Sequence, residues 1–256
     1  MPKYFDIHSH LNLAGYEADW EDVVARLREA GTHTIVVGVD LETSKKAVEL
    51  AEIYPEIYAC IGVHPIDHPG GTFDAAAFEV LVRHPKTVAV GECGFDFFHA
   101  DKAQDFGRQA ELFNKQIDFA LAHDKPLMIH ARNAYPELLE VLERRHAEVG
   151  SALKGNVHFF AGTLPEARRF WALGFSTSFT GVVTFTSQYD EVVKEAPIAL
   201  LQAETDAPYV APTPYRGARN EPAYVKEIYA RLASIRGEDP ENLRLALVEN
   251  ALRMIG

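Results

Sequence analysis

Cysteine is scarce in this sequence, which contains only Cys60 and Cys93 among 256 residues. These residues form no Cys-x-x-Cys pair, so neither a disulfide framework nor a thiolate zinc site is predicted. We expect both thiols to be buried, reduced and structural. No run of about 18 apolar residues occurs, and the opening MPKYFDIH lacks the pattern of a signal peptide. We therefore expect a cytoplasmic protein without a membrane segment.

Basic residues are outnumbered by acidic ones: 25 Lys and Arg stand against 37 Asp and Glu, a formal net charge of -12. Proteins that grip nucleic acid through a broad basic face gain their affinity by neutralising phosphates. The charge balance argues against that mode of binding. A phosphate-bearing substrate is still compatible with it if metal ions supply positive charge locally.

Short apolar segments alternate with longer segments of helical periodicity along the whole chain. Near-continuous apolar strands separated by helices predict a parallel sheet covered on its faces. We expect an α/β fold with one domain over residues 1–256, a TIM-type (β/α)8 barrel, because eight such units in about 250 residues fit that size. An open doubly wound sheet is the alternative, but HSHLN stands where its glycine-rich fingerprint often lies. The predicted strands are Tyr4 to Ile7, Thr34 to Val37, Ile57 to Ile61, Val88 to Val90, Leu127 to Ile129, Lys154 to Val157, Phe175 to Phe179 and Leu200 to Ala203.

Three helices are also predicted from the pattern, over residues 102–123, 223–232 and 239–254. The last of them begins with Asp239-Pro240, a cap residue followed by proline at the first helical position. The segment from Pro208 to Pro222 is rich in Pro, Arg and Tyr, and we expect it to be a loop.

Two histidines, His8 and His10, follow the first predicted strand. Residues i and i+2 of a strand point to the same face, so both imidazoles would face one point. A divalent metal needs such convergence. A pair of half-exposed histidines at a strand end is the alternative interpretation of this spacing.

Further metal-compatible residues follow later strands, and they are Glu92, His130, His158 and Asp206. The carboxyl ends of parallel barrel strands share one face, so residues far apart in the sequence converge there. Singly, each could be a hydrogen-bonded core histidine, a salt-bridge partner or a cap. Together with His8 and His10 they make four imidazoles and two carboxylates, a set that suits zinc, manganese, iron or nickel better than magnesium. We expect the remaining histidines to be surface residues, namely His33, His68, His84, His99, His123 and His146.

Seven motifs occur in the order in which the TatD family of metal-dependent hydrolases carries them: FDIHSHL, IGVHP, GECGFDF, MIHAR, HFFAG, AETDAPY and RGARNEP. They span essentially the entire chain, which therefore resembles that family. The resemblance implies an amidohydrolase-like barrel with one or two divalent metal ions, such as Zn, Mn, Mg or Ni. It implies that His8, His10, Glu92 and Asp206 hold one ion, and that the second is held by Glu92, His130 and His158.

The resemblance also implies roles around the ions. His64 would lie in the mouth near the substrate, although a histidine that orders the turn before Pro65 fits the same spacing. Arg132 or Arg219 would touch a substrate phosphate or brace the mouth through ion pairs.

Three more residues are expected to support the site. Asp96 and Asn220 match family positions, and Glu204 would orient a ligand histidine from the strand face that it shares with Asp206. GFDF and HFFAG depart from the commoner GLDY and HCFSG, so we expect a more apolar mouth from Phe95, Phe98, Phe159 and Ala161.

The activity that the resemblance implies is that of a deoxyribonuclease, cutting phosphodiester bonds of single-stranded or frayed ends like a 3'-5' exonuclease. Divalent ions would activate a water molecule. Asp206 would accept the water proton beside Glu92, unless its role is ligation alone. DNA or another phosphodiester would bind at the barrel mouth, and no obligate protein partner is indicated.

Two alternatives stay open. One is a hydrolase of a small carboxylic ester or amide, or of an aminoacyl ester on tRNA. The other is a non-catalytic metal-holding barrel that binds nucleotides or a protein partner, because fold and site do not guarantee turnover.

Overall fold

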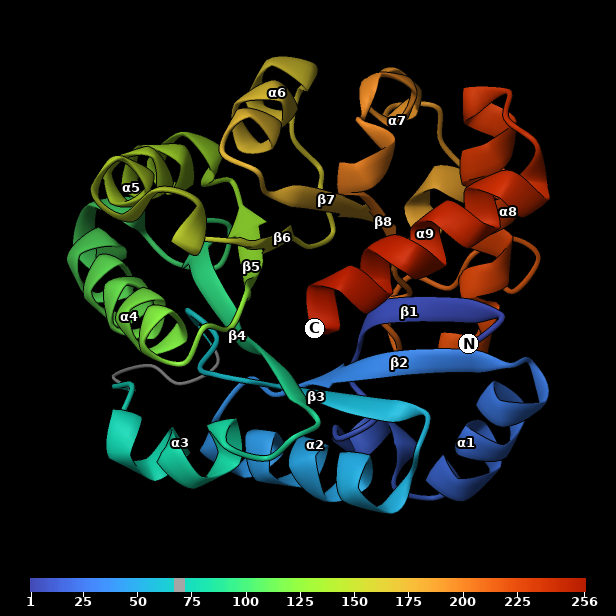
Figure 1. Ribbon diagram of the computed structural model, residues 1–256, viewed down its shortest axis with the longest axis horizontal. Helices are drawn as coiled ribbons and strands as arrows, with labels where there is room; N and C mark the ends of the chain where they lie inside the picture. The colour runs from blue at the N-terminus through green and yellow to red at the C-terminus, as the bar shows by residue number, and fades with distance from the viewer. Residues whose placement is uncertain (67–71) are drawn as a thin grey trace.

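A closed ring of parallel strands forms the centre of this computed structural model, which describes residues 1–66 and 72–256. The eight strands follow one another in chain order, each paired with the next (Figure 1). This confirms the TIM-type barrel. The strands are β1 (Tyr4–Ser9), β2 (Thr32–Val37), β3 (Ile57–Ile61), β4 (Thr87–Asp96), β5 (Leu127–Arg132), β6 (Gly155–Val157), β7 (Ser176–Phe179) and β8 (Leu201–Ala203).

Backbone contacts between β1 and the segment after β8 close the barrel. The Asp206 amide donates to the His8 carbonyl at 2.9 Å, and the His10 amide donates to the Ala207 carbonyl at 2.7 Å. Ser9 and Ala207 form a parallel bridge between the two segments. Closure therefore places His8, His10 and Asp206 side by side, although about two hundred residues separate them in the sequence.

Helices surround the strands in Figure 1. The capping prediction for the last helix is confirmed, since the Asp239 carboxylate accepts from the amides of Glu241 and Asn242 and Pro240 is the first helical residue. Residues 208–221 form the predicted loop. The helices are α1 (Trp20–Glu29), α2 (Leu41–Ile53), α3 (Ala75–Val82), α4 (Lys102–Ala122), α5 (Tyr135–Val149), α6 (Leu164–Ala172), α7 (Asp190–Glu195), α8 (Val225–Arg236) and α9 (Pro240–Ile255), with short 3-10 turns that include η3 (Gly181–Thr184) and η5 (Pro222–Tyr224).

The amino end of the barrel is covered by α9, whose last turns lie over the ring of strands (Figure 1). Its Asn250 amide group donates to the carbonyls of Ile198 and Leu201 at 2.6 and 2.9 Å. One apolar cluster joins strand residues such as Phe5 and Met128 to α9. The predicted site residues lie at the opposite, carboxyl end of the strands, where a cavity opens.

Both cysteines are buried and free, as predicted. In the described part of the chain, no helix combines the length and apolar character needed to cross a bilayer. The one-domain organisation and the cytoplasmic location stay predictions. His68 lies outside the described residues.

Candidate metal centre

A cavity of about 650 Å³ opens at the carboxyl ends of the strands. It is lined by residues at or after the carboxyl ends of every strand except β7, so the convergence expected of a TIM-type mouth is present. The predicted site residues that line it are His10, His64, Glu92, Asp96, His130, Arg132, His158 and Asp206.

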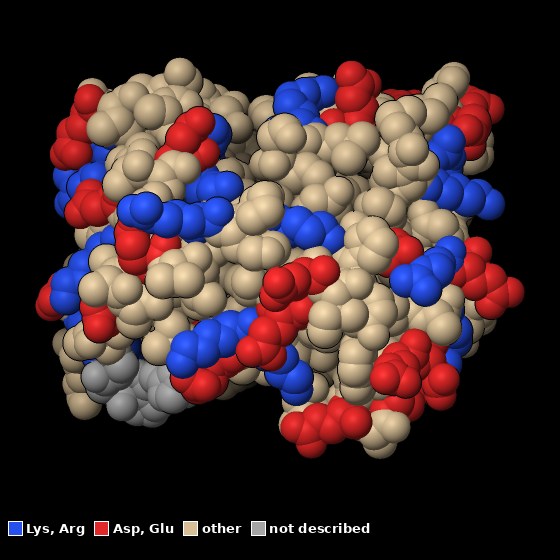
Figure 2. All heavy atoms as spheres, turned by 60° about the horizontal axis from the view of Figure 1, so that its bottom comes forward, with Lys and Arg blue, Asp and Glu red and all other residues tan. Residues whose placement is uncertain are grey.

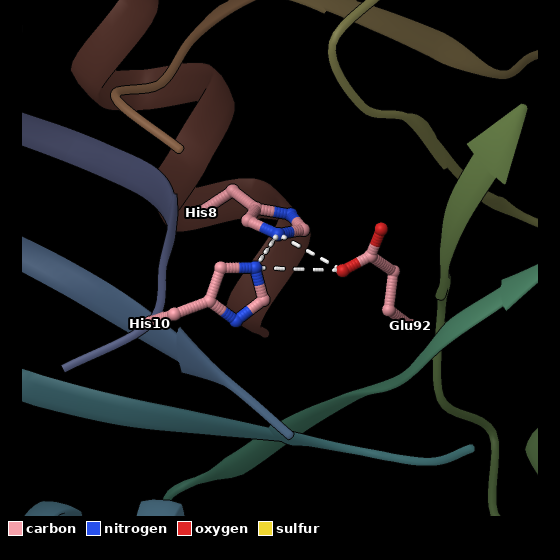
Figure 3. Close-up of side chains that lie close together, drawn as sticks. All are labelled: His8, His10 and Glu92. Atoms are coloured by element: carbon pink, nitrogen blue, oxygen red, sulfur yellow. Dashed lines mark hydrogen bonds and ion pairs between the residues drawn. The ribbon is translucent and has the colours of Figure 1, made fainter. Parts of the chain in front are cut away.

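One group of side chains lies on the Oε2 side of Glu92. The Nε2 atoms of His8 and His10 are 3.1 Å apart, and they lie 3.4 and 3.5 Å from Glu92 Oε2 (Figure 3). Asp206 Oδ1 lies 3.7 Å from His8 Nε2 and 3.5 Å from His10 Nε2. Two imidazoles and two carboxylates therefore face a common point, from β1 and the residue just after it, from β4 and from the segment after β8.

A second group lies on the Oε1 side of Glu92. His158 Nε2 and His130 Nδ1 approach Glu92 Oε1 at 2.7 and 2.9 Å, and these two nitrogens are 3.4 Å apart. His64 Nε2 lies 3.6 Å from the same oxygen. Glu92 thus turns one oxygen to each group.

The tautomers of two rings test whether a cation fits. The His10 Nδ1–H donates to the Val37 carbonyl at 2.9 Å, and the His130 Nε2–H donates to the Asp96 carboxylate at 3.1 Å. In the neutral form of His10 only one nitrogen carries hydrogen, so its Nε2 lone pair faces His8 and Glu92. His130 has a carboxylate at each ring nitrogen, and a metal ion on the Glu92 side would take the place of the Nδ1 hydrogen that Glu92 otherwise accepts. Lone pairs gathered around a carboxylate are the arrangement that a divalent metal ion stabilises. The residues present therefore fit such an ion.

Burial disfavours the charged form of every ring in the cluster. It lowers the pKa of His8 to about 4 and that of His64 to about 3. For His10, His130 and His158 the neighbouring carboxylates outweigh burial and raise the pKa.

The Glu92 carboxyl is also fully buried, which opposes its ionisation. The charge of His158 and the hydrogen bond from His130 nevertheless hold its pKa well below the usual range. The carboxylates therefore attract positive charge into the cluster, and protons or a metal ion can supply it.

Comparison with known proteins decides the family. The family described as TatD related DNase matches residues 5–256. The chain belongs to this family. It is 40% identical over 255 residues to "Uncharacterized metal-dependent hydrolase YabD" of Bacillus subtilis, covering 98% of each chain. It is 33% identical to "3'-5' ssDNA/RNA exonuclease TatD" of Citrobacter rodentium, covering 98% of this chain and 97% of that one.

A solved structure agrees with this membership of the TatD family. The crystal structure of YjjV, a TatD homologue from Escherichia coli, superposes with a TM-score of 0.89 at 30% identity, covering 99% of this chain and 98% of that one. The chain is therefore a metal-dependent hydrolase whose cofactor is a divalent metal ion. In this TatD-family member the metal-compatible side chains lie around Glu92 at the carboxyl ends of the strands.

The supporting residues expected in this TatD-family chain lie against the histidines. Glu204 Oε1 is 3.4 Å from His158 Nδ1, and Glu204 also accepts from the Phe159 amide at 2.5 Å and the Ser178 hydroxyl at 2.7 Å. Asp96 accepts from His130 and holds that ring's tautomer. A carboxylate thus lies behind each of the two histidines of the second group, His130 and His158, as is usual at metal sites.

His99 is exposed, as predicted. It also contacts the site, because its Nδ1 pairs with Asp96 Oδ2 at 2.9 Å and the ring lines the cavity. Nothing in its spacing distinguishes it from a loop histidine. The loop after β4 folds back on Asp96, whose Oδ1 accepts the backbone amides of Phe98 and His99.

The two predicted arginines have different surroundings. Arg132 is exposed at the cavity rim, with its guanidinium 4.1 Å from the centre of the Phe98 ring. Arg219 instead donates to both carboxylate oxygens of Asp19 at 2.7 Å. Asn220 is buried and donates to the carbonyls of Thr205 and Tyr209. Of the two arginines, Arg132 is therefore the one that faces the cavity, and Arg219 braces a loop.

The expectation that Phe95 makes the mouth more apolar is wrong. Phe95 is fully buried and packs on Phe106 and Phe113 of α4, because its side chain points outward from the barrel. Phe159 and Ala161 do line the cavity.

A buried carboxyl group escaped the sequence analysis. Asp6 accepts from the Thr205 amide at 2.8 Å and from its hydroxyl at 2.6 Å, and the Thr34 hydroxyl lies 3.3 Å away. Asp6 thereby ties β1 to the segment that carries Asp206. Its signal was an acidic residue inside an otherwise apolar strand.

Proposed function

We propose that this chain hydrolyses phosphodiester bonds as a deoxyribonuclease, removing nucleotides from single-stranded or frayed ends in the 3'-5' direction. The observation that carries the proposal is Glu92, which presents separate oxygens to two groups of imidazoles beneath an open cavity. The Citrobacter rodentium relative is named as a 3'-5' exonuclease of single-stranded DNA and RNA, which supports the substrate class.

Two divalent ions would share Glu92. His8, His10 and Asp206 would complete the first set of ligands, and His130 and His158 would complete the second. Imidazole mixed with carboxylate suits Zn, Mn or Ni better than Mg. When bound, such ions supply an activated water molecule and offset the negative charge of the substrate.

Asp206 would accept the proton of the attacking water. Its carboxylate lines the cavity, remains 8% exposed and lies beside His8 and His10. The water oxygen forms a new bond to phosphorus, one P–O ester bond breaks, and the released nucleoside oxygen takes up a proton. A general base needs this kind of proximity to the water that it deprotonates.

The cavity residues His64 and Arg132 would hold the substrate. Arg132 offers a planar set of donors that suits a phosphate group. His64 Nδ1 is also 3.4 Å from the Ile66 amide, so the ring orders the turn after β3 while its Nε2 faces Glu92.

A substrate comparison tests the proposal. Metal-stripped protein would be reloaded with Zn, Mn, Mg or Ni, then given bis(p-nitrophenyl) phosphate, a single-stranded oligonucleotide labelled at its 5' end, and p-nitrophenyl acetate. We expect both phosphodiesters to be cleaved, with the oligonucleotide shortened stepwise from its 3' end. Cleavage of the acetate alone would contradict the proposal and favour carboxylic esters.

A further inference from the structure

The molecule carries a net charge of -12, so a polyanion such as nucleic acid must be held by local positive charge. On the face shown in Figure 2, basic and acidic side chains are interspersed. Ion pairs engage every arginine of the described residues except Arg132, Arg144 and Arg216. Among the described arginines, guanidinium charge that is not already paired is therefore confined to three positions.

Two of these three arginines lie on exposed phenylalanine rings. Arg132 lies 4.1 Å from the centre of the Phe98 ring, and Arg216 lies 3.5 Å from the centre of the Phe185 ring. Phe98 is 58% exposed and Phe185 is 42% exposed. The same arrangement, a guanidinium over the face of an exposed phenylalanine ring, therefore occurs at two separate places.

Both pairs belong to loops on the carboxyl side of the barrel. Phe98 and Arg132 come from the ends of β4 and β5, while Phe185 follows η3 after β7 and Arg216 lies in the 208–221 loop after β8. The Thr213 amide donates to the Thr184 hydroxyl at 2.9 Å, which ties that loop to η3.

An exposed tyrosine of the 208–221 loop lines the same cavity as Arg132. Tyr209 is 52% exposed and contacts the His10 ring with a centroid distance of 6.3 Å. Phe98, Arg132, Tyr209, Phe185 and Arg216 thus lie on the face that holds the metal-compatible cluster.

We propose that these five residues, here called the aromatic track, bind a single-stranded polynucleotide across the mouth. This inference rests on the proposed function and deepens it. A guanidinium stacked on a ring keeps its in-plane donors available for phosphate, and bases stack on aromatic faces without regard to sequence. The track would let an acidic protein hold a strand through a few charges.

The experiment measures binding without cleavage. Metal-stripped protein in EDTA would be titrated into a fluorescent oligothymidylate of about 12 nucleotides, a length within the known range of site sizes, and anisotropy would be followed at several salt concentrations. The variants are Arg132→Ala, Arg216→Ala, Phe98→Leu and Phe185→Leu. Arg144→Ala is the matched control, because Arg144 is an unpaired arginine on the outer helix α5.

We expect each arginine variant to raise Kd roughly fivefold or more and to reduce the slope of log K against log salt by about 0.7. Each phenylalanine variant should raise Kd roughly fivefold or more without changing that slope. Arg144→Ala should bind like the unaltered chain.

Three results would overturn the track: no binding by the unaltered chain, unchanged Kd in the four variants, or equal weakening by Arg144→Ala. Hydrolysis of bis(p-nitrophenyl) phosphate by the metal-loaded unaltered chain tests the proposed function separately. Binding along the track with no such hydrolysis would support the surface and contradict the nuclease.

Discussion

Glu92 is the residue on which the two histidine groups depend. It is 3% exposed, and its oxygens lie 2.7 Å from His158 and 3.4 Å from His8. A buried carboxylate with so many imidazoles around it has no purely structural need for them, since one or two donors would satisfy its oxygens.

Replacing Glu92 by glutamine keeps the shape and removes the charge. We expect Glu92→Gln to lose more metal affinity than the roughly 10- to 100-fold that follows from loss of an outer hydrogen-bond partner. Calorimetric titration with Zn and with Mn measures this. Wild-type affinity in this variant, with the fold intact by circular dichroism, would show that Glu92 does not bind the ions.

Asp96 affects the candidate metal site indirectly, through its hydrogen bond with His130. Asp96→Asn should weaken metal binding by roughly 10- to 100-fold, because the neutral amide holds the Nε2–H of His130 less firmly. His99→Ala is the control, since it removes the other side chain on Asp96 and leaves the His130 contact in place. If both variants bind metal equally, Asp96 does not position His130.

The spacing of His8 and His10 correctly predicted that the two rings converge, but strand alternation is not the physical reason. His8 and His10 do converge, yet β1 ends at Ser9 and its register against β2 shifts between Asp6 and Ser9. Simple strand alternation therefore does not explain their meeting. The Val37 carbonyl and the closure onto Ala207 orient His10, and both are tertiary contacts that no local pattern records.

At the scale of elements, β4 and β5 run further than their apolar cores predict. Pairing continues through Gly94 with His130 and Asp96 with Arg132, so Glu92 and His130 lie within strands and not after them. Because their side chains are polar, a hydrophobic pattern does not extend the predicted strands through these residues. Gly94 has a φ of 136°, and a Cβ there would lie 2.1 Å from the His130 carbonyl oxygen.

Gly94→Ala should therefore lower the free energy of unfolding by about 3 kcal/mol or more, because both the backbone and the neighbouring strand oppose the methyl group. Gly107→Ala is the matched change, at an exposed α4 position where a Cβ meets nothing within 4 Å. It should raise stability by about 0.5–1 kcal/mol. Urea unfolding compares the two, and equal effects would contradict the role of Gly94.

At the scale of the whole molecule, the eight-unit rhythm was sufficient to predict the barrel, since each strand pairs with its neighbour in the chain. The alternation of strands and helices did not predict the outward direction of Phe95, the contact of His99 with Asp96, or the pairing of Arg219 with Asp19. The direction of Phe95 is set within β4 and by its packing on α4, whereas the other two contacts depend on how loops fold over the mouth.

The cluster draws ligands from strands around the barrel, so a bound ion should link distant parts of the fold. We expect metal to stabilise the native state by about 2.7 kcal/mol at a free concentration 100 times Kd. Thermal unfolding in EDTA and with added Zn or Mn measures the shift. A Tm that does not respond to metal would show that the folded chain does not bind it.

The central claim is that two ions share Glu92, and the number of ions per chain tests it most directly. Elemental analysis of protein equilibrated with Zn or Mn would compare the unaltered chain with a His130→Ala, His158→Ala double variant. The account predicts two ions in the unaltered chain and one in the variant, which keeps His8, His10, Glu92 and Asp206. The same number in both proteins, or no ion in the unaltered chain, would contradict it.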